Sequence, residues 1–283
     1  MNKTKARILL ISVFIARGTS FLFSKILLNT MSPLSILAVR FTMAFLILAV
    51  VFYKKMLKLS LNSFRGGAIL GILYTICMFF EMYALRLIDT GVCSLIENMA
   101  IVLVPVFAAV LARSLPRAWT MLCAVLAVIG VGFLSLTQRT STGGSFGIIL
   151  AILAMITYAL CIMTTETASR DGEPVSVGII QLGTMGVISM IASLFTESWQ
   201  VPHTVLEWSM MFLLVLYCSC FGFAFQPLGQ KYLPAEEAAV LTVMNPLTAS
   251  VMGILIAGEG MSVFKLVGYV LILLALFLYN SKG

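Results

Sequence analysis

Four ionisable residues lie inside otherwise apolar stretches of the chain: Arg17, Arg40, Glu81 and Glu97. A charge in such a stretch is costly unless it is paired or faces water. Two cations and two anions can nearly neutralise one another, as a buried network requires. Side chains of these types can fix the packing of helices, bind a charged solute or exchange a proton.

Polar residues without charge occupy apolar stretches further along the chain. Gln181, Gln226 and Asn245 each stand among apolar residues there. The second half of the chain is therefore neutral where the first is charged. We expect one half to bind charged groups and the other half mainly to move relative to the first.

The elements that position these residues follow from the composition. Of 283 residues, 61% are hydrophobic and 10% are charged, whereas about one quarter of a soluble domain is charged. Backbone polar groups must be paired within lipid, and long unbroken apolar runs favour helices over the alternating strands of a barrel. We predict an all-α integral membrane protein with ten transmembrane helices. The predicted spans are residues 8–28, 33–53, 67–86, 91–112, 117–136, 146–165, 175–195, 208–229, 236–257 and 263–279.

The 18 Lys and Arg residues indicate how these spans are oriented. Twelve fall on the side of the N-terminus, four fall opposite and two lie inside spans. Because cytoplasmic loops carry the excess of Lys and Arg, we predict both termini in the cytoplasm and a location in the plasma or inner membrane. Topology thus explains the net charge of +7, and no nucleic-acid partner is expected. Connections of about two to twelve residues leave no room for an extramembrane domain.

Three of the charged residues are expected at a similar depth in the membrane. At about 1.5 Å per helical residue, Arg40, Glu81 and Glu97 lie roughly 7 to 11 Å below the outer face. We predict that they form one polar cluster in the outer half of a central cavity. Arg17, near the midplane, lies below it at the solute site. Glu81 and Glu97 are the candidates for proton coupling, with Glu81 favoured because its counterpart Gln226 cannot titrate. A static pair of Arg40 with a glutamate, which only fixes packing, stays open.

The two halves of the chain correspond in position. An offset of 141 residues lays Arg40 on Gln181, and the same offset lays Arg17 on Tyr158. Five helices per repeat is an odd number, so the second repeat crosses the membrane in the opposite sense. Inverted repeats of this kind are typical of secondary transporters. The expected domains are two inverted five-helix repeats, residues 1–141 and 142–283.

Several short motifs recur in the order and spacing of a known family. The chain resembles the drug/metabolite transporter superfamily, of the type with EamA domains. The resemblance covers nearly the whole chain and rests on the combination of its motifs. These are Ser32-Pro33, Ala38-Val39-Arg40-Phe41, Leu103-Val104-Pro105, Gly130-Val131-Gly132-Phe133-Leu134, Asn245-Pro246, and Gly258-Glu259 followed by Gly268.

The resemblance implies ten helices in two five-helix halves, with spans 1 to 4 and 6 to 9 around a cavity and spans 5 and 10 at the periphery. Two positions depart from the family pattern. Arg17-Gly18 stands where Trp-Gly is common, and Arg113-Ser114 stands where many first halves carry Gly-Glu. The first departure places a cation where an aromatic ring is usual, which bears on any substrate preference carried over.

We predict a secondary active transporter, an exporter, that moves small amphipathic or zwitterionic metabolites such as amino acids by alternating access. The expected partners are the small-molecule substrate, the lipid bilayer and, as candidate coupling ion, protons. No G-x-x-x-x-G-K-[ST] sequence is present, so ATP does not drive transport on this chain. The candidate substrate-binding residues are Arg17, Arg40, Glu81, Glu97, Tyr158, Gln181 and Asn245.

Two other classes of function stay open, a structural membrane subunit without transport of its own and an intramembrane enzyme. An enzyme would need a nucleophile with a base, and the single histidine, His203, falls in a loop between spans. All six cysteines fall within predicted spans and are interpreted as small packing residues. Neither a metal site nor a cofactor is expected.

Overall fold

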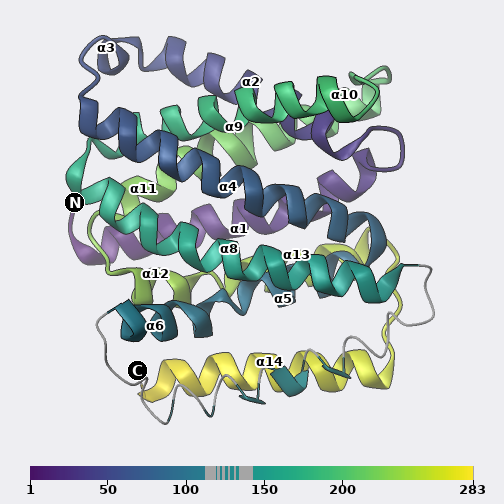
Figure 1. Ribbon diagram of the computed structural model, residues 1–283. Coiled ribbons are helices and arrows are strands. Elements are labelled where there is room, and N and C mark those ends of the chain that lie inside the picture. Colours follow the sequence, from purple (N-terminus) through teal and green to yellow (C-terminus); the bar gives the residue numbers. More distant parts are fainter. Residues whose placement is uncertain are drawn as a thin grey trace.

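The computed structural model describes residues 1–111 and 143–282 and, between them, residues 119, 122, 125–126, 128–130 and 132–133. All regular elements in this part of the chain are helical. Figure 1 shows the helices running roughly parallel to one another across the molecule. They are α1 (Lys3–Leu27), α2 (Pro33–Val51), α3 (Tyr53–Met56), α4 (Leu61–Leu87), α5 (Thr90–Asn98), α6 (Ala100–Leu111), α8 (Gly144–Asp171), α9 (Pro174–Thr196), α10 (Val205–Leu213), the π-helix η1 (Leu214–Phe223), α11 (Ala224–Gln230), α12 (Ala235–Leu241), α13 (Met244–Leu255) and α14 (Val263–Lys282).

Eight segments within the described residues are long and apolar enough to cross a membrane. They confirm the prediction of an all-helical membrane protein. Helix α14 adds a shorter apolar stretch, Val263–Ala275, at the predicted tenth span. The predicted fifth span, 117–136, lies largely outside the described residues. The eight segments are α1, α2, α4, α5 with α6, α8, α9, α10 with η1 and α11, and Glu237–Leu255.

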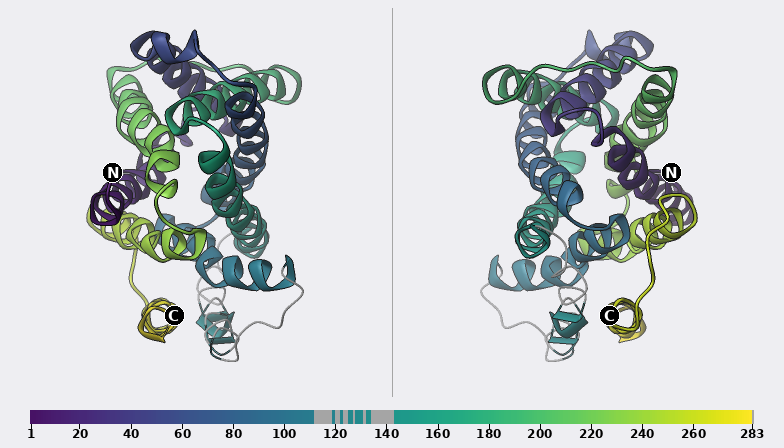
Figure 2. Two further views of the ribbon diagram at one scale, coloured as in Figure 1. Left: turned by 90° about the vertical axis from the view of Figure 1, so that its left-hand side faces the viewer. Right: turned by 90° about the vertical axis from the view of Figure 1, so that its right-hand side faces the viewer.

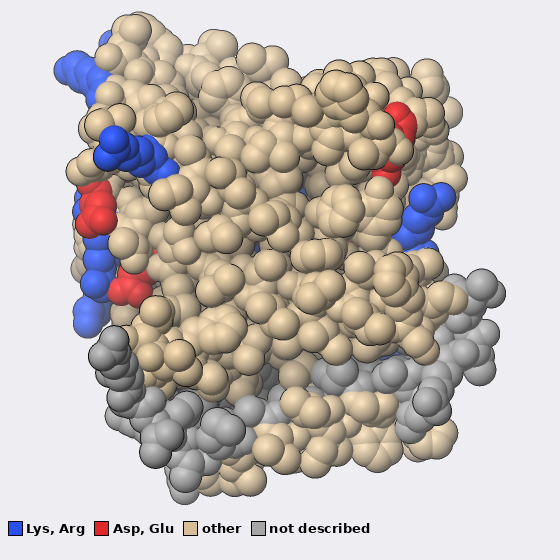
Figure 3. Space-filling view, in the orientation of Figure 1, with Lys and Arg blue, Asp and Glu red and all other residues tan. Residues whose placement is uncertain are grey.

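The surface between the two ends of the helices is apolar. On the face drawn in Figure 3, the charged side chains gather near the two ends of the helices, with a broad uncharged area between them. Large apolar side chains such as Val50 and Phe195 are exposed, the latter by 85%. A surface of this kind is suited to lipid rather than to water.

One end of the bundle holds the start of α1 and the end of α8. Arg7, in the first turns of α1, forms an ion pair with Glu237 of α12. Glu166, near the end of α8, accepts a 2.8 Å hydrogen bond from the backbone N–H of Ala235 at the start of α12. We call this end the N-side, because the N-terminus lies there (Figure 1).

The other end, here called the opposite side, holds the end of α1 and the start of α8. Lys25, near the end of α1, donates a 2.8 Å hydrogen bond to the carbonyl oxygen of Ile88, which follows α4. Gly147, in the first turns of α8, packs so closely on Ile88 that an added Cβ would lie 2.7 Å from its side chain. The first helices of the two halves therefore run in opposite directions, as an inverted repeat requires.

Packing between the two halves is reciprocal. Helix α1 packs on η1 and α13, while α8 packs on α4, α5 and α6. Helix α2 packs on η1, α9 packs on α4, and α2 and α9 pack on each other. Each contact has a counterpart in which the halves exchange roles, as a two-fold relation demands. The two halves consequently interleave in space rather than forming separate lobes (Figures 1 and 2).

The fourth span of each half is broken near its middle. Met99 separates α5 from α6, and Thr242 and Val243 separate α12 from α13. Pro246 has no N–H to donate to the carbonyl of Thr242, which instead accepts from the N–H of Asn245 at 2.8 Å. The predicted fourth and ninth spans are both present as apolar spans, and each consists of two short helices joined at a break.

The third span of the second half contains the ten-residue π-helix η1. Pro227 follows Phe223 by four residues and cannot donate to its carbonyl, so the α-helical pattern is interrupted where η1 ends. Wider turns of this kind occur frequently at functional sites. Here they place Ser219 and Phe223 in the interior, where both are buried.

Helix α14 lies at the edge of the bundle. Both views of Figure 2 show it standing apart from the interleaved helices. The indole Nε1 of Trp119 donates a 3.0 Å hydrogen bond to the carbonyl oxygen of Leu278 in α14. A peripheral position of the tenth span agrees with the arrangement that the resemblance implied.

Candidate functional site

Arg17 of α1 lies inside the bundle, enclosed by three aromatic rings. It is 4% exposed. Its guanidinium carbon lies 4.2 Å from the ring centre of Phe223, 5.1 Å from that of Tyr158 and 5.3 Å from that of Tyr74. All three are cation–π distances. The rings belong to η1, α8 and α4, so both halves of the chain build this aromatic cage.

Neutral oxygen atoms complete the surroundings of Arg17. Its Nη1 donates to Oε1 of Gln226 at 2.5 Å and to the hydroxyl of Tyr74 at 3.2 Å. The Tyr74 hydroxyl donates in turn to the same Gln226 oxygen at 3.2 Å, and Gln226 donates from Nε2 to Gln230 at 2.8 Å. No carboxylate oxygen of the described residues lies within 4.0 Å of Arg17. Ring faces and amide dipoles, rather than an ion pair, therefore hold its charge.

Arg40 of α2 is completely buried, yet only one nitrogen of its guanidinium group has a hydrogen-bond partner among the described residues. Nε donates a 2.7 Å hydrogen bond to the hydroxyl of Ser219. Nη1 and Nη2 have no hydrogen-bond partner among the described residues, and no carboxylate oxygen there lies within 4.0 Å. The ring of Phe41 lies 4.9 Å away and that of Phe223 lies 5.6 Å away. An orphaned guanidinium fork is costly in the interior, which marks it as a place for a missing partner.

Glu81 of α4 and Glu97 of α5 form a carboxyl pair. Their side chains lie next to each other, and neighbouring carboxylates in the interior repel each other, which favours one proton shared between them. Both residues are 1% exposed, and one oxygen of each has no partner in the described part of the chain. Arg40 and Arg17 lie within Coulombic range of Glu81, and Arg17 within that of Glu97. The pair can bind or release one proton without breaking an ion pair.

The remaining predicted residues divide into one that joins this group and two that do not. Tyr158 is part of the aromatic cage, and its hydroxyl has no hydrogen-bond partner in the described residues. Asn245 of α13 donates to Asn98 of α5 at 3.1 Å, and so links the two broken helices instead. Gln181 is buried on α9, and none of the described side-chain contacts joins it to the other predicted residues.

Sequence reasoning missed several partners of the two arginines. These partners are Tyr74, Phe223 and Ser219. No local signal distinguishes the two rings, because the chain has 27 Phe, Tyr and Trp residues outside the cage. Gln226 carried a better signal, as an amide inside an apolar span, although it was recognised only as the counterpart of Glu81.

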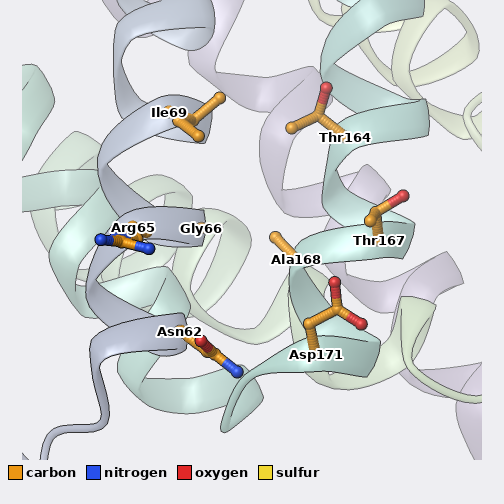
Figure 4. Close-up of a pocket in the computed structure, with 8 residues that line it drawn as sticks. All are labelled: Asn62, Arg65, Gly66, Ile69, Thr164, Thr167, Ala168 and Asp171. Carbon is orange, nitrogen blue, oxygen red and sulfur yellow. The ribbon is translucent and has the colours of Figure 1, made fainter.

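The groove in Figure 4 is a different feature. It has a volume of about 280 Å³ and lies at the N-side, between the start of α4 and the end of α8. Its rim includes Arg65 and Asp171, and none of its lining residues belongs to the predicted site. It is therefore a surface groove rather than the predicted central cavity.

The described residues contain no group of three or more His, Cys, Asp and Glu that could hold a metal ion. The five described cysteines are free and buried. Cys123, and the predicted departure at Arg113-Ser114, lie outside the described residues.

A family model and two curated relatives resemble the chain, one of the relatives over its full length. The model of the EamA-like transporter family matches twice, at residues 4–136 and 145–281. The uncharacterized transporter YvbV of Bacillus subtilis is 23% identical over 292 residues, covering 100% of this chain and 94% of YvbV. An uncharacterized transporter of Archaeoglobus fulgidus is 25% identical over 159 residues, and the match covers 54% of each protein.

A solved structure, described only as the crystal structure of a protein, has the same fold, with a TM-score of 0.71, 16% identity and 98% of both chains covered. Two successive matches to one family model agree with the opposed halves and their reciprocal packing. The chain belongs to the EamA-like transporter family of the drug/metabolite transporter superfamily and is a multi-pass membrane transporter.

Proposed function

We propose that this transporter is a secondary active carrier that exports a small zwitterionic or amphipathic metabolite, such as an amino acid, with protons as the coupling ion. The observation that carries the proposal is the buried guanidinium group of Arg40, whose Nη1 and Nη2 have no partner in the described residues. A carboxylate binds such a fork through two parallel hydrogen bonds. The solute carboxylate is the partner that this site lacks.

The balance of charge supports the same ligand. Two buried arginines carry two positive charges, and a carboxyl pair that shares one proton carries one negative charge. The site therefore holds one positive charge in excess when no solute is bound. A solute carboxylate removes that excess, as a buried network requires.

The carboxyl pair supplies a place for the ammonium group of the solute. Oε1 of Glu81 and Oε2 of Glu97 have no partner in the described part of the chain, and both can accept from an ammonium group. An ammonium group that binds there favours loss of the shared proton, because two carboxylates then face one cation. Solute and proton thus exclude each other at the pair. Inward movement of protons would in this way drive outward movement of solute.

Alternating access needs two halves that move against each other around a fixed site. The broken spans α5–α6 and α12–α13 occupy corresponding places in the two halves, and Asn98 and Asn245 link them at the breaks. Discontinuous helices in corresponding positions typically mark the solute site of inverted-repeat transporters. We place the axis of rocking at this link.

The proposed orientation puts both termini in the cytoplasm of a plasma or inner membrane. Its support is the excess of Lys and Arg on the side of the N-terminus. Cysteines introduced at Lys282 and His203 test it in intact cells with a membrane-impermeant thiol reagent. We expect labelling at position 203 and protection at position 282, and the reverse pattern would overturn the orientation.

The substrate class is tested by ligand-dependent thermal stabilisation of the purified protein. An amino acid should stabilise it, while the matching amide, which lacks the carboxylate, and the N-acetyl derivative, which lacks the ammonium group, should not. Arg40→Gln should abolish the response, and Arg40→Lys should weaken it about 10- to 100-fold because the charge remains without the fork. Arg86→Gln, at an exposed arginine, is the matched control. Equal stabilisation by acid and amide would refute a carboxylate subsite at Arg40.

A further inference from the structure

We infer that the rings of Tyr74, Tyr158 and Phe223 form a cation-binding site that the protein keeps filled with the guanidinium group of Arg17. In this view Arg17 is a tethered ligand and a specificity-determining residue. It denies the cage to free organic cations. The site would take a guanidinium, an amidinium or a small methylated ammonium group.

The cage has the geometry of a cation site. The planes of the Tyr74 and Tyr158 rings meet at 62° and those of the Tyr74 and Phe223 rings at 76°, so the rings stand at steep angles to one another instead of stacking. A cation inside faces π-electron density from several directions, which is how aromatic cages recognise ammonium groups. Gln226 adds one neutral acceptor oxygen, 2.5 Å from Nη1.

The way Arg17 enters the cage supports its role as the occupant of the cage. A Cβ added to Gly222 would lie 3.0 Å from Cγ of Arg17, so the aliphatic stem passes over a position of η1 that has no side chain. The hydroxyl of Tyr158 is buried and has no hydrogen-bond partner in the described residues. Arg17 also has no ion pair among the described residues. Ring faces and an amide oxygen therefore bind this cation.

A filled cage has a consequence for selectivity. A second cation that approaches the site meets a buried positive charge at short range, where the low dielectric strengthens the repulsion. The unpartnered nitrogens of Arg40 add to it. Removal of Arg17 should therefore convert a site that rejects cations into one that binds them. This conversion does not depend on what the wild-type protein transports.

The test measures binding of ethylguanidinium, with ethylurea as a neutral analogue of similar shape, to the purified protein by isothermal titration calorimetry. Arg17→Ala should bind ethylguanidinium saturably, at least tenfold more tightly than the wild type does, and should not bind ethylurea. Arg17→Ala combined with Phe223→Leu should lose about tenfold in affinity, as expected for one cation–π contact. Arg86→Ala, which removes an exposed guanidinium group, should create no site.

Loss of a buried side chain can impair folding, so the same ligands are also added during solubilisation. If Arg17→Ala is unstable, ethylguanidinium and not ethylurea should restore the yield of monodisperse protein. The inference is overturned if the two ligands act alike on Arg17→Ala in both measurements. It is equally overturned if the wild type binds ethylguanidinium as tightly as the variant does, because the cage would then not be filled by Arg17.

Discussion

Nη1 of Arg17 donates a 2.5 Å hydrogen bond to Oε1 of Gln226, and this contact joins the first helix of one half to the third span of the other. The two residues are 209 positions apart in the sequence. Since α1 and the η1–α11 segment belong to different halves, the bond lies across the interface at which the proposed alternating access would move the halves against each other. It is therefore expected to matter both for stability and for the choice between conformations.

Replacement of Gln226 tests this contact directly. Gln226→Leu leaves Arg17 without its shortest hydrogen bond and should lower the free energy of unfolding by about 1.5 to 3 kcal/mol, the usual range for a bond to a charged group. Gln226→Glu keeps an acceptor in place and adds an ion pair, so its unfolding temperature in detergent should match or exceed that of the wild type near neutral pH. Equal losses in both variants would show that Gln226 acts through its shape alone.

Proton coupling is predicted to depend on the carboxyl pair. Glu81→Gln removes the carboxyl group that we propose exchanges a proton, but keeps a hydrogen-bonding side chain next to Glu97. In proteoliposomes, uphill transport driven by a pH gradient should be lost, while exchange of solute across the membrane stays measurable. Glu237→Gln, at the N-side surface, serves as the control carboxyl variant and should keep uphill transport. If Glu81→Gln concentrates solute as the wild type does, Glu81 has a structural role only.

Close packing of α1 on α13 is predicted to require Gly18. An added Cβ there would lie 2.7 Å from the carbonyl oxygen of Asn245 and 2.8 Å from Cβ of Thr248. Backbone atoms can move away from so close a contact only at a cost in free energy. Gly18→Ala should therefore lower the free energy of unfolding by about 1 to 3 kcal/mol. Gly132→Ala is the matched control, since an added Cβ meets nothing within 4 Å. Thermal unfolding in detergent compares the two, and a loss in the control as large as in Gly18→Ala would refute the packing argument.

The pH dependence of stability is predicted to include a contribution from Glu173 at the N-side surface. Partial burial opposes its ionisation, but hydrogen bonds from Lys55 Nζ at 2.6 Å and from Ser176 lower the pKa of this carboxyl below its usual value. A lowered pKa gives stability that is present above the pKa of the unfolded chain and is lost as the pH falls through the folded value.

Lys55→Met should therefore reduce stability at neutral pH, and the deficit should disappear in acid. The ion pair is about 40% exposed at both side chains, so the effect should be only about 0.5 kcal/mol. Unfolding temperatures between about pH 3 and pH 7 measure it. Lys58→Met, at a lysine without an ion pair in the described part of the chain, should show no such dependence. A deficit for Lys55→Met that persists in acid would contradict the assignment.

Much of the architecture could be predicted from the sequence because its causes are local. Long apolar runs identify membrane-spanning helices, since in lipid the backbone N–H and C=O groups must form their hydrogen bonds within each segment. The odd number of spans per repeat implied inversion, and the opposed directions of α1 and α8 agree with it. The cost of a charge in lipid singled out Arg17, Arg40, Glu81 and Glu97, and all four are buried.

The partners of these charges were decided only by the tertiary structure. Depth along a helix can be counted from the sequence, but the direction in which a side chain points depends on how the helix is rotated against its neighbours. Two proline residues, Pro227 and Pro246, accompany departures from regular helix that alter this rotation near the site. Arg17 therefore meets three rings and an amide instead of a carboxylate, because contacts over such separations are set by packing and not by spacing along the chain.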